Sequence, residues 1–217
     1  MSRLSFLLLT LLCSSALAQE KDWRDVPLKE LGIETLKPMK DDKTGFVAGG
    51  KNDTALLRKL THINGRTIDE LEKDMRPGGL STKGFLGPKE KLLDILAEDN
   101  DHVVGKLGLS HQELARHLLV LGAIAQKKSQ VVLYHGQKFF VQAVVFRGFA
   151  LSPFQDGTKT NTEITVTNEA TGKKLIYSLL VPIMMERYGF YEGHDTPYRV
   201  EPGRIIEVLD FLAPKKK

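Results

Sequence analysis

The hydrophobic periodicity of this chain changes near residue 130, and that change limits the folds open to it. Before residue 130, apolar side chains recur every three or four positions, which is typical of amphipathic helices. After it, apolar and polar residues alternate, as in strands with one buried face. Because helices and strands are segregated along the chain, the sequence predicts an α+β fold, in which an N-terminal helical part packs on a C-terminal antiparallel sheet.

The helical part is marked by two capping boxes, in which a hydroxyl residue and a glutamate three positions later bond to each other's backbone amides. They begin at Thr67 and Ser110. The helix after Ser110 is apolar on nearly every side over residues 113–124, so we expect it at the centre of the fold. Shorter helices are expected over 55–60 and from Pro88, because proline suits the first turn of a helix.

The strand part contains two expected hairpins, which form either an open sheet or a small closed barrel. The first hairpin turns at His135 and Gly136, and the second turns over residues 168–173. We expect a loop over 149–162 between the hairpins. The expected bounds are 130–134 and 138–146 for the first hairpin, 163–167 and 174–180 for the second, 183–188 for a following helix, and Pro202 for the start of a C-terminal helix.

Residues 1–18 have the features of a secretory signal peptide. A basic residue precedes the apolar run 4–12, and small residues lead up to a cleavage site after Ala18. The run is about half of the roughly 20 residues needed to span a bilayer, so we expect export rather than anchoring. The alternative is a lipid anchor on Cys13, although Leu12 stands where such a site requires a small residue. The sequence therefore predicts a secreted or periplasmic protein.

The mature chain is divided by its composition into three expected segments. Residues 19–53 form an extended polar arm, which Trp23 and a few other apolar residues anchor to the main body. Residues 54–127 form a helical subdomain. Residues 128–217 form a subdomain of antiparallel strands and a helix, and we expect the two subdomains to make one compact unit.

Charge and cysteine content exclude several classes of protein. The signal peptide holds the single cysteine and one of the 31 basic residues, so 30 basic residues remain against 27 acidic ones. A cysteine-free mature chain has neither a disulfide framework nor a thiol nucleophile. The excess of positive charge is confined to the lysine tail at 215–217, so we expect no nucleic-acid partner. No later apolar run reaches the length of a transmembrane segment.

The densest group of ionisable residues lies on a glycine-containing loop and consists of Glu192, His194 and Asp195. Two carboxylates and an imidazole within four residues can converge on a metal ion or act as an acid–base or binding set. Asp156 and Glu163 join this group if the two loops meet at one end of the sheet. We assign no metal ligand, because the spacing matches no metal-binding motif.

Aromatic residues flank the same loop. Tyr188 and Tyr191 offer ring faces with a polar hydroxyl, a combination that suits sugars or peptides. Alternatively, these rings pack the last segment of the chain onto the sheet. The sequence leaves both interpretations open.

Two functions remain open beside a purely structural role in the cell envelope without a small ligand. The chain lacks a phosphate-binding glycine loop, a dinucleotide fingerprint and a nucleophile elbow. We therefore hypothesise a non-catalytic exported protein that binds a protein, peptide or glycan through the loops 152–163 and 188–198. The alternative is a hydrolase or metal-dependent enzyme that uses the Glu/His/Asp loop cluster. The sequence identifies no cofactor.

Overall fold

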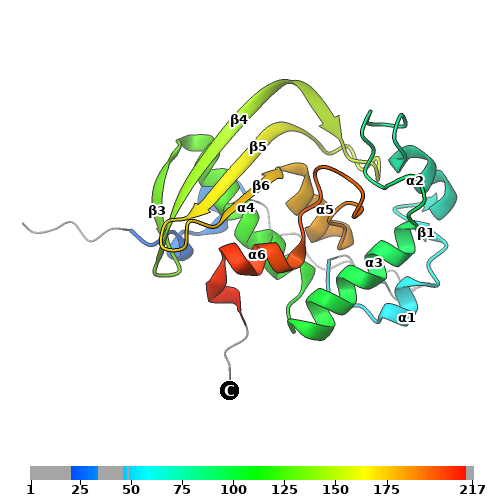
Figure 1. Ribbon diagram of the computed structural model, residues 1–217, viewed down its shortest axis with the longest axis horizontal. Helices are drawn as coiled ribbons and strands as arrows, with labels where there is room; N and C mark the ends of the chain where they lie inside the picture. The colour runs from blue at the N-terminus through cyan, green and yellow to red at the C-terminus, as the bar shows by residue number, and fades with distance from the viewer. Residues whose placement is uncertain (1–20, 34–45, 48, 214–217) are drawn as a thin grey trace, which may run out of the picture.

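The computed structural model describes residues 21–33, 46–47 and 49–213 (Figure 1). The expected signal peptide, the middle of the polar arm and the lysine tail lie outside these residues. Within the described part of the chain, no helix combines the length and the apolar character needed to cross a membrane.

The described residues form an α+β structure with two antiparallel sheets, as the periodicity predicts. The larger sheet has the strand order β3-β4-β5-β6, and its outer strands do not pair with each other, so it is open rather than a barrel. The strands are β1 (His62–Ile63), β2 (Arg66–Thr67), β3 (Gln130–Tyr134), β4 (Gln137–Leu151), β5 (Lys159–Asn168) and β6 (Lys174–Ser178). The α-helices are α1 (Thr54–Leu57), α2 (Ile68–Met75), α3 (Leu92–Asn100), α4 (His111–Lys127), α5 (Leu180–Tyr188) and α6 (Pro202–Val208).

Both predicted hairpins are confirmed. β3 pairs with β4, and β5 pairs with β6, in the expected order along the chain. The first hairpin turns at His135 and Gly136, whose φ angles of 52° and 74° are those of the two-residue turns that suit twisted strands. Gly189, with a φ of 69°, ends α5 at the predicted position.

The segment between the two hairpins differs from the prediction. We expected a loop over 149–162, but β4 continues to Leu151 and β5 begins at Lys159, so that only a short connection remains. The register of this pair shifts between Val145 and Ala150. An irregularity of this kind breaks the alternation of apolar and polar residues, and this is why the sequence pattern does not reveal the strand.

The central position of α4 is confirmed, since this helix contacts both the sheet and α5. The Tyr177 hydroxyl in β6 donates a hydrogen bond to the Leu118 carbonyl at 2.6 Å. Gly122 lets the helix approach the junction between β6 and α5 closely, because a Cβ there would lie 2.9 Å from Leu179 Cδ1. The buried residues of α4 are His111, Leu114, Ala115, Leu118, Val120, Leu121, Gly122, Ile124 and Ala125.

The starts of two helices follow the predicted capping boxes, and the start of α3 does not follow its prediction. The paired bonds are present at Thr67 and at Ser110. We expected a helix from Pro88, but α3 begins at Leu92. Its first amide donates to Glu72 Oε1 at 2.8 Å, so a carboxylate from α2 caps the helix in place of a local residue.

Candidate ligand cavity

The outer half of the β4–β5 hairpin curves over the molecule from the α4 side towards α2 (Figure 1). We call residues 142–163 the arch. Its tip is attached to the helical part of the chain, because Asn64 Nδ2 donates to the Phe154 carbonyl at 3.1 Å and Gln155 Nε2 donates to Asp74 Oδ2 at 2.6 Å. The arch is therefore held at its tip as well as at its base in the sheet.

Two of the candidate site residues, Asp156 and Tyr188, form a further attachment of the tip. Asp156 Oδ2 accepts hydrogen bonds from Arg187 Nη1 at 2.8 Å and from the Tyr188 hydroxyl at 2.9 Å. The Tyr188 ring stacks on Phe154 with 3.8 Å between centroids. Burial raises the pKa of Asp156, but hydrogen bonds led by that from Arg187 outweigh it and lower the pKa to about 2. Neither residue lines the cavity beneath the arch.

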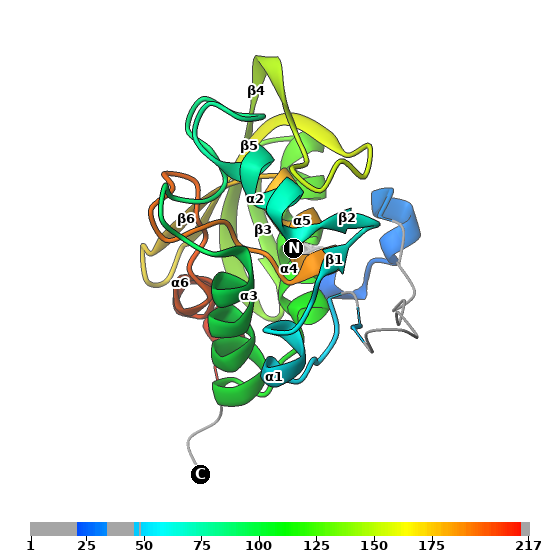
Figure 2. The same ribbon diagram turned by 90° about the vertical axis from the view of Figure 1, so that its right-hand side faces the viewer.

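A cavity of about 410 Å³ lies beneath the arch. Its walls come from the loop after α2, the arch itself and the segment after α5. Figure 2 shows the loop after α2 beside the arch at one end of the molecule. This volume is within the range of small-molecule sites in proteins, roughly 300–1,000 Å³. Its larger apolar and aromatic residues are Leu80, Phe85, Phe146, Phe149, Leu151, Leu180 and Tyr198.

The polar part of the wall comes from hydroxyl groups, the amide of Asn161 and carboxylic acids. Ser81, Thr160 and Thr162 are among the hydroxyl residues, and Glu163 and Glu192 are the acids. No lysine, arginine or histidine is among the described residues that line the cavity. The wall therefore offers no cationic side chain to an anionic ligand.

Glu192 is the most unusual residue of the wall. Only 3% of the residue's surface is exposed to solvent. Its φ angle of 69° is in the left-handed region that non-glycine residues rarely adopt. The Thr196 hydroxyl donates to Glu192 Oε2 at 3.1 Å. Burial is the main influence on this carboxyl and raises its pKa to about 8, against the lowering effects of Thr196 and Arg199.

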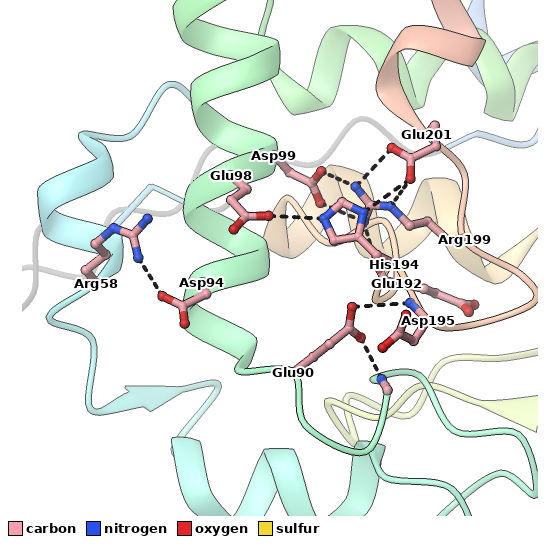
Figure 3. A network of polar contacts seen from close by, with 11 residues as sticks. Arg58, Glu90, Asp94, Glu98, Asp99, Glu192, His194, Asp195, Arg199 and Glu201 are labelled. Carbon is pink, nitrogen blue, oxygen red and sulfur yellow. Dashed lines mark hydrogen bonds and ion pairs between the residues drawn. The ribbon is translucent and has the colours of Figure 1, made fainter.

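The backbone of Glu192 is held by residues that the sequence analysis did not single out. Arg199 Nη1 donates to the Glu192 carbonyl, and the same guanidinium forms ion pairs with Asp99 and Glu201 (Figure 3). Gly193 N donates to the Phe85 carbonyl at 2.8 Å. The buried ion pair has no signature in local sequence, because Asp99 and Arg199 are a hundred residues apart.

His194 and Asp195 lie outside the cavity, and Figure 3 shows the Glu192 carboxyl pointing away from them. His194 Nε2 is 3.1 Å from Glu98 Oε2, and its Nδ1 is 3.3 Å from Glu201 Oε1. The Asp195 amide donates to Glu90 Oε1 at 3.2 Å. These contacts fasten the loop to α3 and to the segment before it.

Tyr191 is also placed away from the cavity. Its ring is fully buried, and its hydroxyl is 3.0 Å from Nδ1 of His111. His111 Nε2 is 3.3 Å from Asn100 Oδ1, so the imidazole bridges two polar partners inside the core. Burial lowers the pKa of His111 to about 4, which keeps the ring neutral.

The candidate residues are thus divided among separate environments. Glu163 and Glu192 line the cavity, whereas Asp156, Tyr188 and Tyr191 hold the surrounding structure together. Within the described residues, no group of three His, Cys, Asp or Glu side chains is arranged to hold a metal ion.

These features define an α+β protein with an open antiparallel sheet and a cavity under its longest hairpin. No protein-family model, curated protein or solved structure matches the chain. The cavity and its residues are therefore the basis for the function proposed next.

Proposed function

We propose that this chain is an exported, non-catalytic binding protein that holds a small ligand with an apolar part in the cavity under the arch. The observation that carries the proposal is the cavity itself, which joins residues of the arch to residues of the loop after α5. A concave site with apolar walls and a few polar groups is the usual form of a small-molecule site.

The exposure of the arch supports this proposal. Phe146 and Phe149 line the cavity and are 53% and 59% exposed. Grouped, exposed apolar residues are uncommon on the surface of a monomeric protein and usually mark a place where something binds. A ligand in the cavity covers part of these rings and removes them from water.

The polar groups of the cavity favour binding over catalysis. Ser81 and Ser178 line the wall, but no histidine that could act as their general base is among the described residues of the wall. The Ser178 hydroxyl oxygen accepts a hydrogen bond from the Leu180 amide. Glu192, the buried acid of the wall, accepts a hydrogen bond from the Thr196 hydroxyl at 3.1 Å.

The cavity is tested with Nile red, a neutral dye whose fluorescence rises in an apolar site. We expect saturable enhancement with the mature protein and loss of it in Ala150→Trp, which fills the cavity from the arch. The matched control is Val131→Trp, a substitution at an exposed strand position that does not line the cavity. Equal enhancement in both variants, or none in the unmodified protein, would contradict the proposal.

Export is tested by expressing the full chain with its N-terminus intact in a bacterial host. We expect the mature form in the periplasm or the medium, with Gln19 as its first residue by mass spectrometry, as the Ala-x-Ala pattern predicts. A chain that begins at an acylated Cys13 would instead establish the lipid anchor. A full-length chain retained in the cytoplasm would contradict export.

A further inference from the structure

The cavity has one deeply buried acid without a counter-ion, and this points to the chemistry of its ligand. We infer that the cavity under the arch binds a protonated primary amine attached to an apolar or aromatic group, with the Glu192 carboxylate as the counter-ion. The inference rests on the proposed function and adds the class of ligand to it.

The groups around Glu192 leave its charge unpaired. Its carboxyl receives one hydrogen bond, from the Thr196 hydroxyl to Oε2. The nearest cation is Arg199, whose guanidinium binds the Glu192 carbonyl rather than the carboxyl and is paired with Asp99 and Glu201. Glu192 forms no ion pair with any residue that the structure describes.

A buried carboxyl without a cation resists ionisation, and burial accordingly raises the pKa of Glu192 to about 8. An ammonium group that enters the cavity supplies the missing charge and three hydrogen-bond donors. An anionic ligand finds no oppositely charged partner, because no lysine, arginine or histidine is among the described residues that line the cavity. The side chains of the wall thus favour a cationic group next to Glu192.

The other acid of the wall, Glu163, is a weaker candidate. Glu163 is only half-buried, so water solvates its carboxylate, whereas Glu192 is 3% exposed. Glu192 is therefore the acid whose charge gains more from a cationic ligand.

The apolar part of the ligand is matched by the aromatic residues of the wall. Phe146, Phe149 and Tyr198 line the cavity and are each at least half exposed. The Lys159 ammonium lies over the Phe149 ring, 5.2 Å from its centroid, so within the described part of the chain Phe146 and Tyr198 are the rings without such a contact. Aromatic faces also attract ammonium groups, and this attraction strengthens where water is excluded. An aryl-alkyl amine satisfies both halves of the cavity.

The test compares three compounds that share a phenylpropyl framework: 3-phenylpropylamine, 3-phenylpropanol and 3-phenylpropanoate. Their dissociation constants are measured by calorimetry at pH 7.5 with the mature protein. We expect the amine to bind at least about tenfold more tightly than the alcohol, because a charge-assisted hydrogen bond in a buried site contributes that much. We expect the carboxylate to bind most weakly.

The decisive variant is Glu192→Gln, which removes the charge and keeps the shape. We expect the amine to lose its advantage over the alcohol, while the alcohol keeps its affinity. The matched control is Glu163→Gln, in which the preference for the amine persists. The thermal midpoint of each variant without ligand reports whether it is folded.

The outcomes separate this inference from the proposed function. Equal binding of the amine and the alcohol to the unmodified protein would overturn the inference and leave the cavity as a binding site. Loss of the preference in Glu163→Gln rather than in Glu192→Gln would also overturn it. No binding of any of the three compounds, together with no Nile red signal, would overturn both proposals.

Discussion

Arg199 and Asp99 form a bidentate ion pair, with Nη2–Oδ1 and Nη1–Oδ2 distances of 2.6 and 3.2 Å, and their side chains are only 4% and 3% exposed. The pair joins the end of α3 to the segment after α5, a hundred residues later. The same guanidinium binds the carbonyl of Glu192. The backbone of Glu192, the buried acid of the cavity wall, is therefore held by an arginine that is itself fixed in a buried ion pair.

Breaking this pair is expected to destabilise the whole protein. Arg199→Met leaves the Asp99 carboxylate buried without a partner, and such a loss costs about 3–5 kcal/mol of unfolding free energy. Urea denaturation at pH 7 measures it. The control is Arg58→Met, which removes the exposed ion pair with Asp94 and should cost less than about 1 kcal/mol. Similar losses in both variants would contradict the structural role of the buried pair.

Stability is expected to fall in mild acid because of two histidines, the buried His111 and the half-buried His117. Burial lowers the pKa of His111 and of His117 to about 4, below the value of 6.5 in the unfolded chain. The unfolded state then binds more protons between pH 6.5 and 4, so stability is lost as the pH falls through this window, by at most about 3 kcal/mol for each histidine.

Urea titrations at half-unit steps from pH 7.5 to 4 measure this loss. His111→Gln and His117→Gln should each remove part of the slope, and the double variant should remove more than either. A slope that is unchanged in the double variant would contradict the assignment to these two residues.

Glu192 is expected to make the protein less stable as the pH rises, which is opposite to the effect of the two histidines. Its folded pKa of about 8 is above its unfolded value of 4.5, so the stability that the protonated carboxyl contributes is complete below pH 4.5 and is lost as the pH rises through 8. Glu192→Gln does not titrate and should become more stable than the unmodified protein as the pH rises, by at most roughly 5 kcal/mol at pH 9. Parallel stability curves of the two proteins between pH 5 and 9 would count against a buried, unpaired Glu192.

The N-terminal arm is expected to stabilise the first hairpin through Asp22. Its carboxylate accepts hydrogen bonds from the backbone amides of His135 at 3.0 Å and of Gly136 at 2.8 Å. Burial opposes ionisation of Asp22, but hydrogen bonds from backbone amides outweigh it and lower the pKa. Asp22→Ala should cost about 1–2 kcal/mol in urea denaturation, whereas Asp22→Asn keeps an acceptor oxygen and should cost less. If alanine and asparagine have the same effect, these bonds contribute little.

Much of the fold was accessible from the sequence because the signals are local. The capping boxes at Thr67 and Ser110 and the turn at His135 and Gly136 each involve residues within a few positions of one another, and all are present. The failures are non-local. The start of α3 depends on Glu72, twenty residues earlier, and the extension of β4 depends on a partner strand beyond an irregular register.

The candidate site was foreseen only in outline. Glu192 and Glu163 were candidates, and both line the cavity, but nothing in the sequence distinguishes them from Asp156 or His194, which have other partners. Tyr191 illustrates the difficulty, because a tyrosine beside a charged loop is compatible with a ligand contact, and only its bond to His111 reveals a residue of the core.

Local chemistry was enough to specify the helix caps, the turns, the alternation of the strands and the apolar character of α4, since each depends on neighbours along the chain. The environment of Glu192 was settled by packing. Its burial, its missing counter-ion and the aromatic wall facing it arise where segments around residues 80–85, 146–151 and 192–199 meet. The intrinsic pKa of a glutamate side chain is the same at every position of the sequence. How much water and how many charges surround that side chain is decided only when distant segments come together in the fold.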